Sequence, residues 1–222
     1  MSTTAIVPMR HESERVPGKN YRELAGRPLY AHILNTLLEC PEVDEVVVDT
    51  DSPVIRAGVE EGYPAVRIID RPHELRGGHV SMNDVLRHDL TLVTADVILQ
   101  THATNPFLRA ATVSAALRAF GAARGDRDSL FSVTAVQKRF WTSDARPVNH
   151  DPEQLLRTQD LPPLYEENSC LYVFPRETLQ RFGRRIGNAP LLYAIDPLEA
   201  WDIDDDRDWA IAEHLATSVV AS

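Results

Sequence analysis

Short apolar runs alternate with amphipathic stretches along the first 136 residues. The apolar runs predict strands at Thr3–Met9, Asp44–Asp51, Pro64–Asp70, Asp96–Gln100 and Ser129–Val136. The stretches between them predict helices at Pro28–Cys40, Pro53–Gly62 with Ser52 as its cap, Ala110–Phe120, and one that begins at Ser81. This alternation is typical of an α/β fold with a mostly parallel sheet and helices on both faces. Such sheets bind ligands beyond the carboxyl ends of their strands.

The rest of the chain is less regular. Residues 137–167 are rich in Pro, Asp, Arg and Gln and have weak periodicity, and a stretch of this length without an element is usually functional or an interaction arm. Beyond it, strands are predicted at Cys170–Phe174 and Pro190–Ile195, and a closing helix at Asp206–Val220. We therefore predict a single domain over residues 1–222, with 137–167 as an excursion.

Composition and charge narrow the functional classes. The chain is 43% hydrophobic and 25% charged, with a net charge of −10, which argues against nucleic acid or an anionic membrane as the main partner. No apolar run is long enough for a membrane span, and we see no signal peptide. The two cysteines, Cys40 and Cys170, form no metal-binding spacing. We expect a protein of the reducing cytoplasm.

The loop after the first strand concentrates positive charge in this acidic chain. It holds Arg10, Arg15 and Lys19, together with Ser13 and Gly18. Cations and free main-chain amides at the end of a strand suit a phosphate-rich anion. Only two of the 23 basic residues are lysines, which suggests that a compact ammonium is needed here, although a lysine on an exposed loop by chance is the alternative.

A second cluster lies near the carboxyl terminus. Asp202 and Asp204 alternate around Ile203, so in an extended segment both carboxylates face the same side. Two such carboxylates, with water and phosphate oxygens, form a natural Mg²⁺ site. The alternative is an over-capped helix start, and we assign that role to Asp205 or Asp206. A cationic loop and an acidic pair together indicate nucleotidyl or phosphoryl transfer with a divalent ion.

Five stretches resemble, in order, the motifs of one enzyme family. The loop PMRHESERVPGKN resembles A-R-x-x-S-K-x-x-P-x-K-N, and the later runs DRPHEL, LQTHATNPFLR, ENSCLY and DIDDDRD resemble R-P-x-x-L, L-Q-x-T-S-P-x-R, N-G-x-x-Y and D-I-D-x-x-x-D. These motifs are those of the sugar-acid cytidylyltransferases, which include CMP-sialic acid synthetase (acylneuraminate cytidylyltransferase) and CMP-Kdo synthetase. The resemblance covers essentially the whole chain.

The resemblance implies a Rossmann-like nucleotidyltransferase fold with a dimerisation arm, and a homodimer. It implies the reaction of CTP with a sugar acid to give a CMP-sugar acid and pyrophosphate. Carried over by position, the nucleotide would be bound by Arg10, Ser13, Lys19, Asn20, Arg71 and Ser81, with Lys19 and Arg10 catalytic. The acceptor would lie near Gln100, Thr104 and Asn168, and Asp202 and Asp204 would hold Mg²⁺, or Mn²⁺, and take part in catalysis.

The chain also departs from the family pattern. Glu14 replaces a lysine beside the phosphates, Ser169 replaces a glycine, and Glu166 and Glu167 add negative charge near the acceptor. These departures leave the acceptor open: a sialic-acid-like sugar, another 2-keto-3-deoxy sugar acid, or a phosphonate or other non-sugar acid. A nucleotidyltransferase that uses another nucleotide, and a nucleotide-binding homologue with impaired catalysis, are the remaining alternatives.

Overall fold

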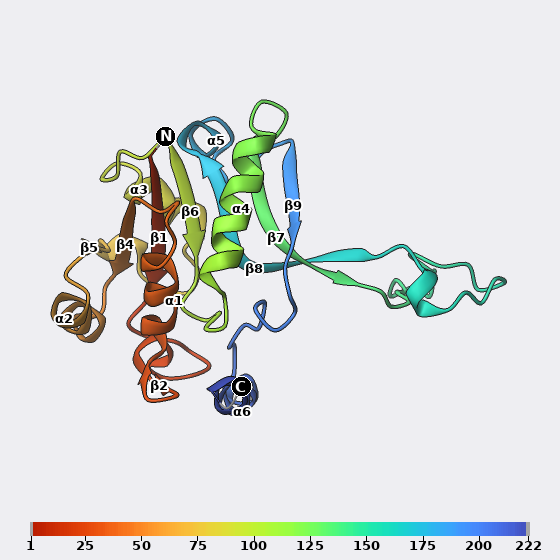
Figure 1. The fold of residues 1–222 in the computed structure, drawn as a ribbon, viewed down its shortest axis with the longest axis horizontal. Helices are drawn as coiled ribbons and strands as arrows, with labels where there is room; N and C mark the ends of the chain where they lie inside the picture. Colours follow the sequence, from red (N-terminus) through yellow and green to blue (C-terminus); the bar gives the residue numbers. More distant parts are fainter. Residues whose placement is uncertain (1, 221–222) are drawn as a thin grey trace.

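The computed structural model describes residues 2–220, with side chains for residues 2–217; residues 1, 221 and 222 of the predicted domain lie outside this range. Within it, seven strands form one sheet in the order β5-β4-β1-β6-β8-β7-β9 (Figure 1). These strands are β1 (Thr3–Met9), β4 (Glu45–Thr50), β5 (Val66–Asp70), β6 (Val97–Thr101), β7 (Ser129–Val136), β8 (Leu164–Pro175) and β9 (Pro190–Ala194). The pairs β1–β4, β1–β6, β4–β5 and β7–β9 are parallel, and β8 is antiparallel to both of its neighbours.

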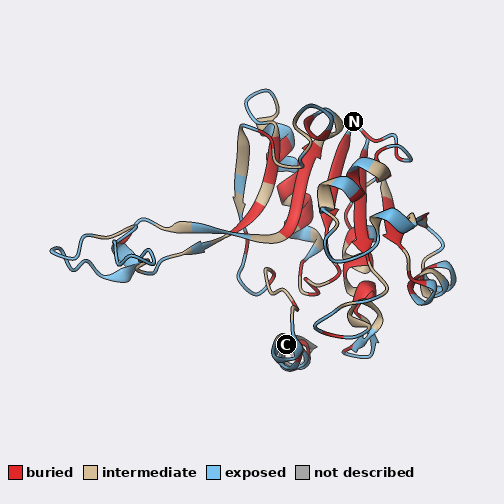
Figure 2. Cartoon of the chain, turned by 180° about the vertical axis from the view of Figure 1, so that it is seen from behind, coloured by how far each residue is buried: buried red, intermediate tan, exposed pale blue. Residues whose placement is uncertain are grey.

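Helices cover both faces of this sheet. The helices are α1 (Leu29–Leu38), α2 (Pro53–Gly62), α3 (Met82–Asp89), α4 (Ala110–Ala123), α5 (Arg176–Phe182) and α6 (Asp206–Val220). Figures 1 and 2 show α1 and α4 on one face and α3 and α5 on the other. Alternate side chains of β1 explain this division, because Ala5 and Val7 pack with α1 and α4 while Ile6 packs with Leu86 of α3.

Short elements complete the description. They are the 3-10 helices η1 (Lys19–Tyr21), η2 (His73–Leu75) and η3 (Thr158–Asp160), and the strands β2 (Glu23–Leu24) and β3 (Arg27–Pro28), which pair with each other. The predicted α/β fold with a mostly parallel sheet is confirmed. Ser52 caps α2 by accepting a hydrogen bond from the backbone N–H of Ile55, as predicted.

An arm projects from the sheet where β7 ends and β8 begins (Figure 1). The pairing of β7 with β8 continues to Val136 and Leu164, so the prediction of an irregular segment up to Glu167 was wrong for residues 164–167. The irregular part is 137–163. Figure 2 shows that the arm is largely exposed, and this exposure explains the weak periodicity, because strands that pack on no core need no alternation of apolar and polar residues.

Candidate active site

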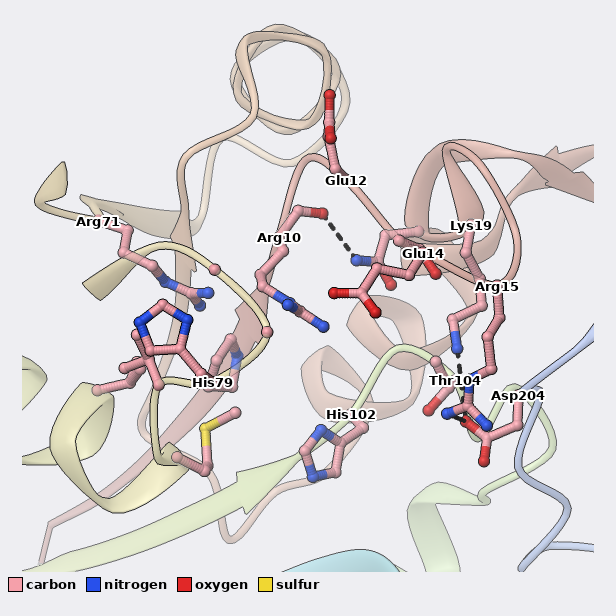
Figure 3. A pocket seen from close by; sticks show the side chains of 18 of the residues that line it. Arg10, Glu12, Glu14, Arg15, Lys19, Arg71, His79, His102, Thr104 and Asp204 are labelled. Carbon is pink, nitrogen blue, oxygen red and sulfur yellow. Dashed lines mark hydrogen bonds and ion pairs between the residues drawn. The ribbon is translucent and has the colours of Figure 1, made fainter. Parts of the chain in front are cut away.

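A cavity of about 880 Å³ opens at the carboxyl end of the sheet, between the loop after β1, the segment 71–80 and the segment 202–204 (Figure 3). Eight of the predicted site residues line it: Arg10, Ser13, Lys19, Asn20, Arg71, Thr104, Asp202 and Asp204. Ser81, Gln100 and Asn168 lie outside its lining. The structure therefore brings the cationic loop and the acidic pair, which are about 180 residues apart in sequence, to one place.

The loop after β1 is held in shape by its own backbone and by one amide side chain. Gly18 has a φ of 65°, and a Cβ there would lie 2.7 Å from the ring of Tyr21, so this position requires glycine. Asn20 donates a hydrogen bond from Nδ2 to the carbonyl oxygen of Arg10, 2.9 Å away. The predicted nucleotide contact of Asn20 is thus accompanied by an observed structural role, which is to close the loop.

Lys19 is the cation that links the loop to the acidic segment. Its Nζ donates to the carbonyl oxygen of Ile203 at 2.6 Å and lies 3.8 Å from Oδ1 of Asp204. The side chain is only 11% exposed. Burial lowers the pKa of Lys19, and the negative charges of Asp202 and Asp204 oppose that effect. Lys19 is therefore a partly desolvated ammonium group whose position is fixed before any ligand binds.

The acidic segment has the alternation that its sequence predicts. Ile203 is fully buried and its N–H donates to the carbonyl oxygen of Thr104 at 2.9 Å, while Asp202 and Asp204 on either side line the cavity. Oδ1 of Asp202 is buried without a hydrogen-bond partner, and burial raises the pKa of this carboxyl. Asp204 forms an ion pair with Arg15, at 2.7 Å, as Figure 3 shows.

Neighbouring residues fix the acidic segment on the protein. Glu199 is buried and accepts hydrogen bonds from the backbone N–H and the guanidinium of Arg109, at the start of α4. Asp205 caps α6, because its Oδ1 accepts from the backbone N–H groups of Arg207 and Asp208. Of the two capping residues that the sequence suggested, Asp205 has this role, and Asp206 instead lies 3.3 Å from Arg22.

Asp202 and Asp204 fit a divalent cation on two observations. Both carboxylates line the same cavity, and one of their oxygens is buried and unpartnered. No group of three or more His, Cys, Asp or Glu with metal-binding geometry occurs among the described residues. The pair Asp202 and Asp204 is the donor set expected for Mg²⁺ that is held by one or two carboxylates, with substrate phosphates and water completing its shell.

Arg71 lines the cavity but is also a buried structural residue. It is 2% exposed and its Nε donates to Oδ2 of Asp49 at 2.9 Å. Its backbone carbonyl accepts two hydrogen bonds from Arg76. The contact with the base or ribose that the resemblance implies therefore has to come from a guanidinium already paired with a buried carboxylate.

Three predicted residues have other observed roles. Ser81 caps α3 by accepting from the N–H of Asn83. Asn168 of β8 links the two strands where the arm begins, because its Oδ1 accepts from Ser132 of β7 and its Nδ2 donates to Thr134 of β7. Gln100 is fully buried on β6, where its Oε1 accepts from Arg185 at 2.5 Å.

Two further polar residues of the cavity wall had no role assigned from the sequence. Arg185 comes from the connection between α5 and β9, and His102 directly follows β6. Burial, with the charges of Arg185 and Lys19, lowers the pKa of His102 to about 3, so the imidazole is neutral at physiological pH. His102 lies in the THATNPF stretch, which the resemblance places near the acceptor, whereas no motif or periodicity marks Arg185.

Two departures from the family pattern acquire a structural context. Glu14 lines the cavity, and its carboxylate lies so close to Gly78 that a Cβ there would be 2.7 Å from Oε1. Ser169, at the position where the family motif has glycine, has a φ of 58°, a left-handed backbone that glycine adopts more readily than serine. The Ser169 hydroxyl accepts from Tyr172 at 3.1 Å, a contact between two residues of β8.

Comparison with known proteins decides the family. The family model described as Cytidylyltransferase matches residues 4–216. The chain belongs to the cytidylyltransferase family. This cytidylyltransferase is 30% identical, over 97% of its own length and 96% of the relative's, to the CMP-N,N'-diacetyllegionaminic acid synthase of Legionella pneumophila. The resemblance predicted from the motifs is therefore confirmed.

Two further relatives match less completely. The N-acylneuraminate cytidylyltransferase of Oncorhynchus mykiss is 28% identical, and the alignment covers 95% of this chain and 49% of that protein, so the chain spans about half the relative's length. The 3-deoxy-manno-octulosonate cytidylyltransferase of Geobacter sulfurreducens is 30% identical over 53% of this chain and 44% of its own.

A solved structure supports the fold. CMP:2-keto-3-deoxy-manno-octonic acid synthetase, complexed with CTP, has a TM-score of 0.74 with this cytidylyltransferase at 17% identity. The match covers 98% of this chain and 99% of that chain. At this identity the likeness shows the fold, which confirms the predicted nucleotidyltransferase architecture.

Proposed function

We propose that this cytidylyltransferase transfers CMP from CTP to a hydroxyl group of a 2-keto-3-deoxy sugar acid and releases pyrophosphate. The observation that carries the proposal is the meeting of Lys19 with Asp202 and Asp204 in one cavity. It is supported by the relatives, whose names are those of synthases for CMP-linked sugar acids or of cytidylyltransferases for sugar acids.

In the proposed reaction the acceptor oxygen forms a bond to the α-phosphorus of CTP. The bond from that phosphorus to the bridging oxygen breaks, and pyrophosphate leaves with the electron pair. The hydroxyl proton passes to one of the two carboxylates, Asp202 or Asp204. Arg10, Ser13 and Lys19 bind the triphosphate, and Lys19 donates to the oxygen on which charge develops. Because Lys19 is already oriented by the carbonyl oxygen of Ile203, little reorganisation is needed.

Asp202 and Asp204 would hold Mg²⁺, or Mn²⁺, at the edge of this site. When bound, the ion would supply positive charge to the phosphate oxygens. The chain's own contribution is to keep the two carboxylates on the cavity side of Ile203, which is anchored in the core with Trp209 of α6. The requirement for a metal is part of the proposal.

The proposal includes a homodimer that uses the arm. Trp141, Val148, Leu155 and Leu156 are exposed on it, at 53%, 51%, 83% and 48%. Apolar residues at this exposure need a partner surface, and a second copy of the chain is the simplest one.

Of the helices in residues 2–220, none combines the length and apolar composition that crossing a membrane requires. That the enzyme works in the cytoplasm stays a prediction.

Pyrophosphate release tests the function directly. The purified protein is incubated with each of the four nucleoside triphosphates and with N,N'-diacetyllegionaminic acid, N-acetylneuraminic acid, 3-deoxy-manno-octulosonate or a phosphonate, with and without a chelator. We expect release only with CTP, a sugar acid and a divalent cation. Preference for another nucleotide, or for the phosphonate, would replace the proposed reaction by one of the alternatives. No release with any combination of nucleotide and acceptor would indicate a homologue with impaired catalysis. Glu14, in the loop after β1, would then be the first residue to examine.

A further inference from the structure

Gln100 cannot itself receive an acceptor in this structure. It is fully buried, and both ends of its amide are engaged. Its Oε1 accepts from Nη1 of Arg185 at 2.5 Å, and its Nε2 donates to the carbonyl oxygen of Thr101 at 3.0 Å and lies 3.0 Å from Nε2 of His102. The two residues that it contacts, Arg185 and His102, do line the cavity.

These contacts fix the hydrogen-bonding state of His102. Arginine only donates, so the amide atom facing Arg185 is the oxygen and the atom facing His102 is the nitrogen. An amide nitrogen also only donates, so Nε2 of His102 carries no proton and accepts. A neutral imidazole then has its proton on Nδ1. His102 thus adds a neutral N–H donor, and no charge, to this part of the cavity wall.

Arg185 is a guanidinium held ready for a ligand. Its backbone N–H donates to Oδ1 of Asn83 on α3, and its Cζ lies 3.5 Å from the centroid of the Tyr172 ring. Stacking occupies the face of the guanidinium and Gln100 occupies one donor, so other edge donors are left for a ligand. Burial lowers the pKa of Arg185, as expected for a cation with little access to water.

The charges around the cavity explain why this cation matters. Glu12, Glu14, Asp202 and Asp204 also line the wall and would repel a carboxylate. Of the lining cations, Lys19 and Arg15 are paired at Asp204, and Arg71 is paired with Asp49. Arg10 belongs to the loop assigned to the triphosphate. Among the ion pairs of the described residues none involves Arg185, and the carboxylate whose charge acts on it is that of Glu167.

We propose that Arg185 binds the carboxylate of the acceptor and thereby selects acidic acceptors, with Gln100 and Tyr172 as the residues that position it. The inference rests on the proposed function. A guanidinium presents parallel N–H donors that match the two oxygens of a carboxylate. In a 2-keto sugar acid the carboxylate is bonded to the carbon that carries the anomeric hydroxyl, so binding the one orients the other toward CTP. Glu167, which accepts from the Tyr172 hydroxyl, completes the support of the stacked ring.

The test compares an acceptor acid with its methyl ester, which lacks the negative charge. Steady-state rates of pyrophosphate release give kcat/KM for each compound with wild-type protein, Arg185→Ala and Arg185→Lys. In Arg185→Ala we expect the KM for the acid to rise by about 10-fold to 100-fold, the loss of a hydrogen bond to a charged group, with the KM for CTP changed less than about threefold. The preference for acid over ester should largely disappear. Arg185→Lys should keep part of that preference, because it keeps the charge.

Arg184→Ala is the matched control, since it removes the same charge from the adjacent residue, which is exposed and lies outside the cavity lining. It should retain the wild-type preference. The acid-to-ester ratio does not depend on the folded fraction of the enzyme, so partial misfolding cannot imitate the effect. If Arg185→Ala kept the wild-type ratio, or if the KM for CTP rose as much as that for the acid, the assignment would be wrong. Wild-type protein without turnover on any acid would instead refute the proposed function, and the inference with it.

Discussion

The substitution Asp89→Asn tests whether a buried carboxylic acid beneath the active site is neutral. Asp89 at the end of α3 is fully buried, and neither of its oxygens has a hydrogen-bond partner. An ionised carboxylate is very costly in that position. Burial, and then the charge of Asp49, raise the pKa of Asp89 to about 8, against the partly compensating charge of Arg71. Burial also raises the pKa of Asp49, and the ion pair with Arg71 opposes that effect.

The sign of the effect follows from the raised pKa. The folded state keeps a proton on Asp89 that the unfolded state has lost above its ordinary pKa of 3.8. The stability that this group contributes is therefore present at low pH and is lost as pH rises from about 4 to about 8. The loss is at most about 1.4 kcal/mol per pH unit, or roughly 3 kcal/mol between pH values of about 5.5 and 7.5. Asparagine mimics the neutral acid and does not titrate.

Urea unfolding of the purified variants, followed by the fluorescence of buried Trp209, measures this difference. The free energy of unfolding of Asp89→Asn minus that of wild type should increase by roughly 3 kcal/mol over those two pH units. Asp84→Asn, on the exposed side of the same helix, is the control and should run parallel to wild type. Parallel curves for Asp89→Asn as well would show that Asp89 is ionised in the folded protein and would refute the reasoning.

Further outcomes are expected at the loop, the metal pair and the arm. Lys19→Ala should lower kcat by about 100-fold or more, because it removes the donor at the reacting phosphate, and Lys19→Arg should also be poor; near-normal turnover would exclude this role. Asp202→Asn should abolish turnover or raise the Mg²⁺ concentration required. Asp206→Asn, which removes only an exposed ion pair with Arg22, should lower stability by about 1 kcal/mol or less. Equal loss of activity in both would mean that the metal pair is misplaced. Gly18→Ala should lower the free energy of unfolding by about 1–2 kcal/mol, because of its positive φ, while Gly62→Ala, which meets no neighbour, should not. Light scattering should show about twice 24.9 kDa, and an active monomer at micromolar concentration would refute the dimer.

The sequence by itself determined the order of most strands and helices in this protein, although it predicted neither α5 nor the short strands β2 and β3. The strands Thr3–Met9 and Ser129–Val136 and the helix Asp206–Val220 were predicted with the bounds that the structure has. Local rules suffice for such elements, since a buried strand must be apolar and a helix needs caps and a period near 3.6 residues. The motifs also identified the family, and with it the two distant clusters that meet in the cavity.

Only the tertiary structure decided which polar residues face the cavity and which are buried behind it. The pairing of Arg71 with Asp49 and the contact of Arg185 with Gln100 each join different elements of the fold, and Asp89 is buried without a hydrogen-bond partner. No local pattern encodes these contacts, because a buried charge is defined by its neighbours in space and not by its position in a strand or helix. The arm β7–β8 was missed in part for the related reason that it packs on no core within one chain. Which apolar residues are buried can be predicted from the sequence pattern. Which partners the individual polar groups have can hardly be predicted, because those partners are set by the packing of the whole sheet.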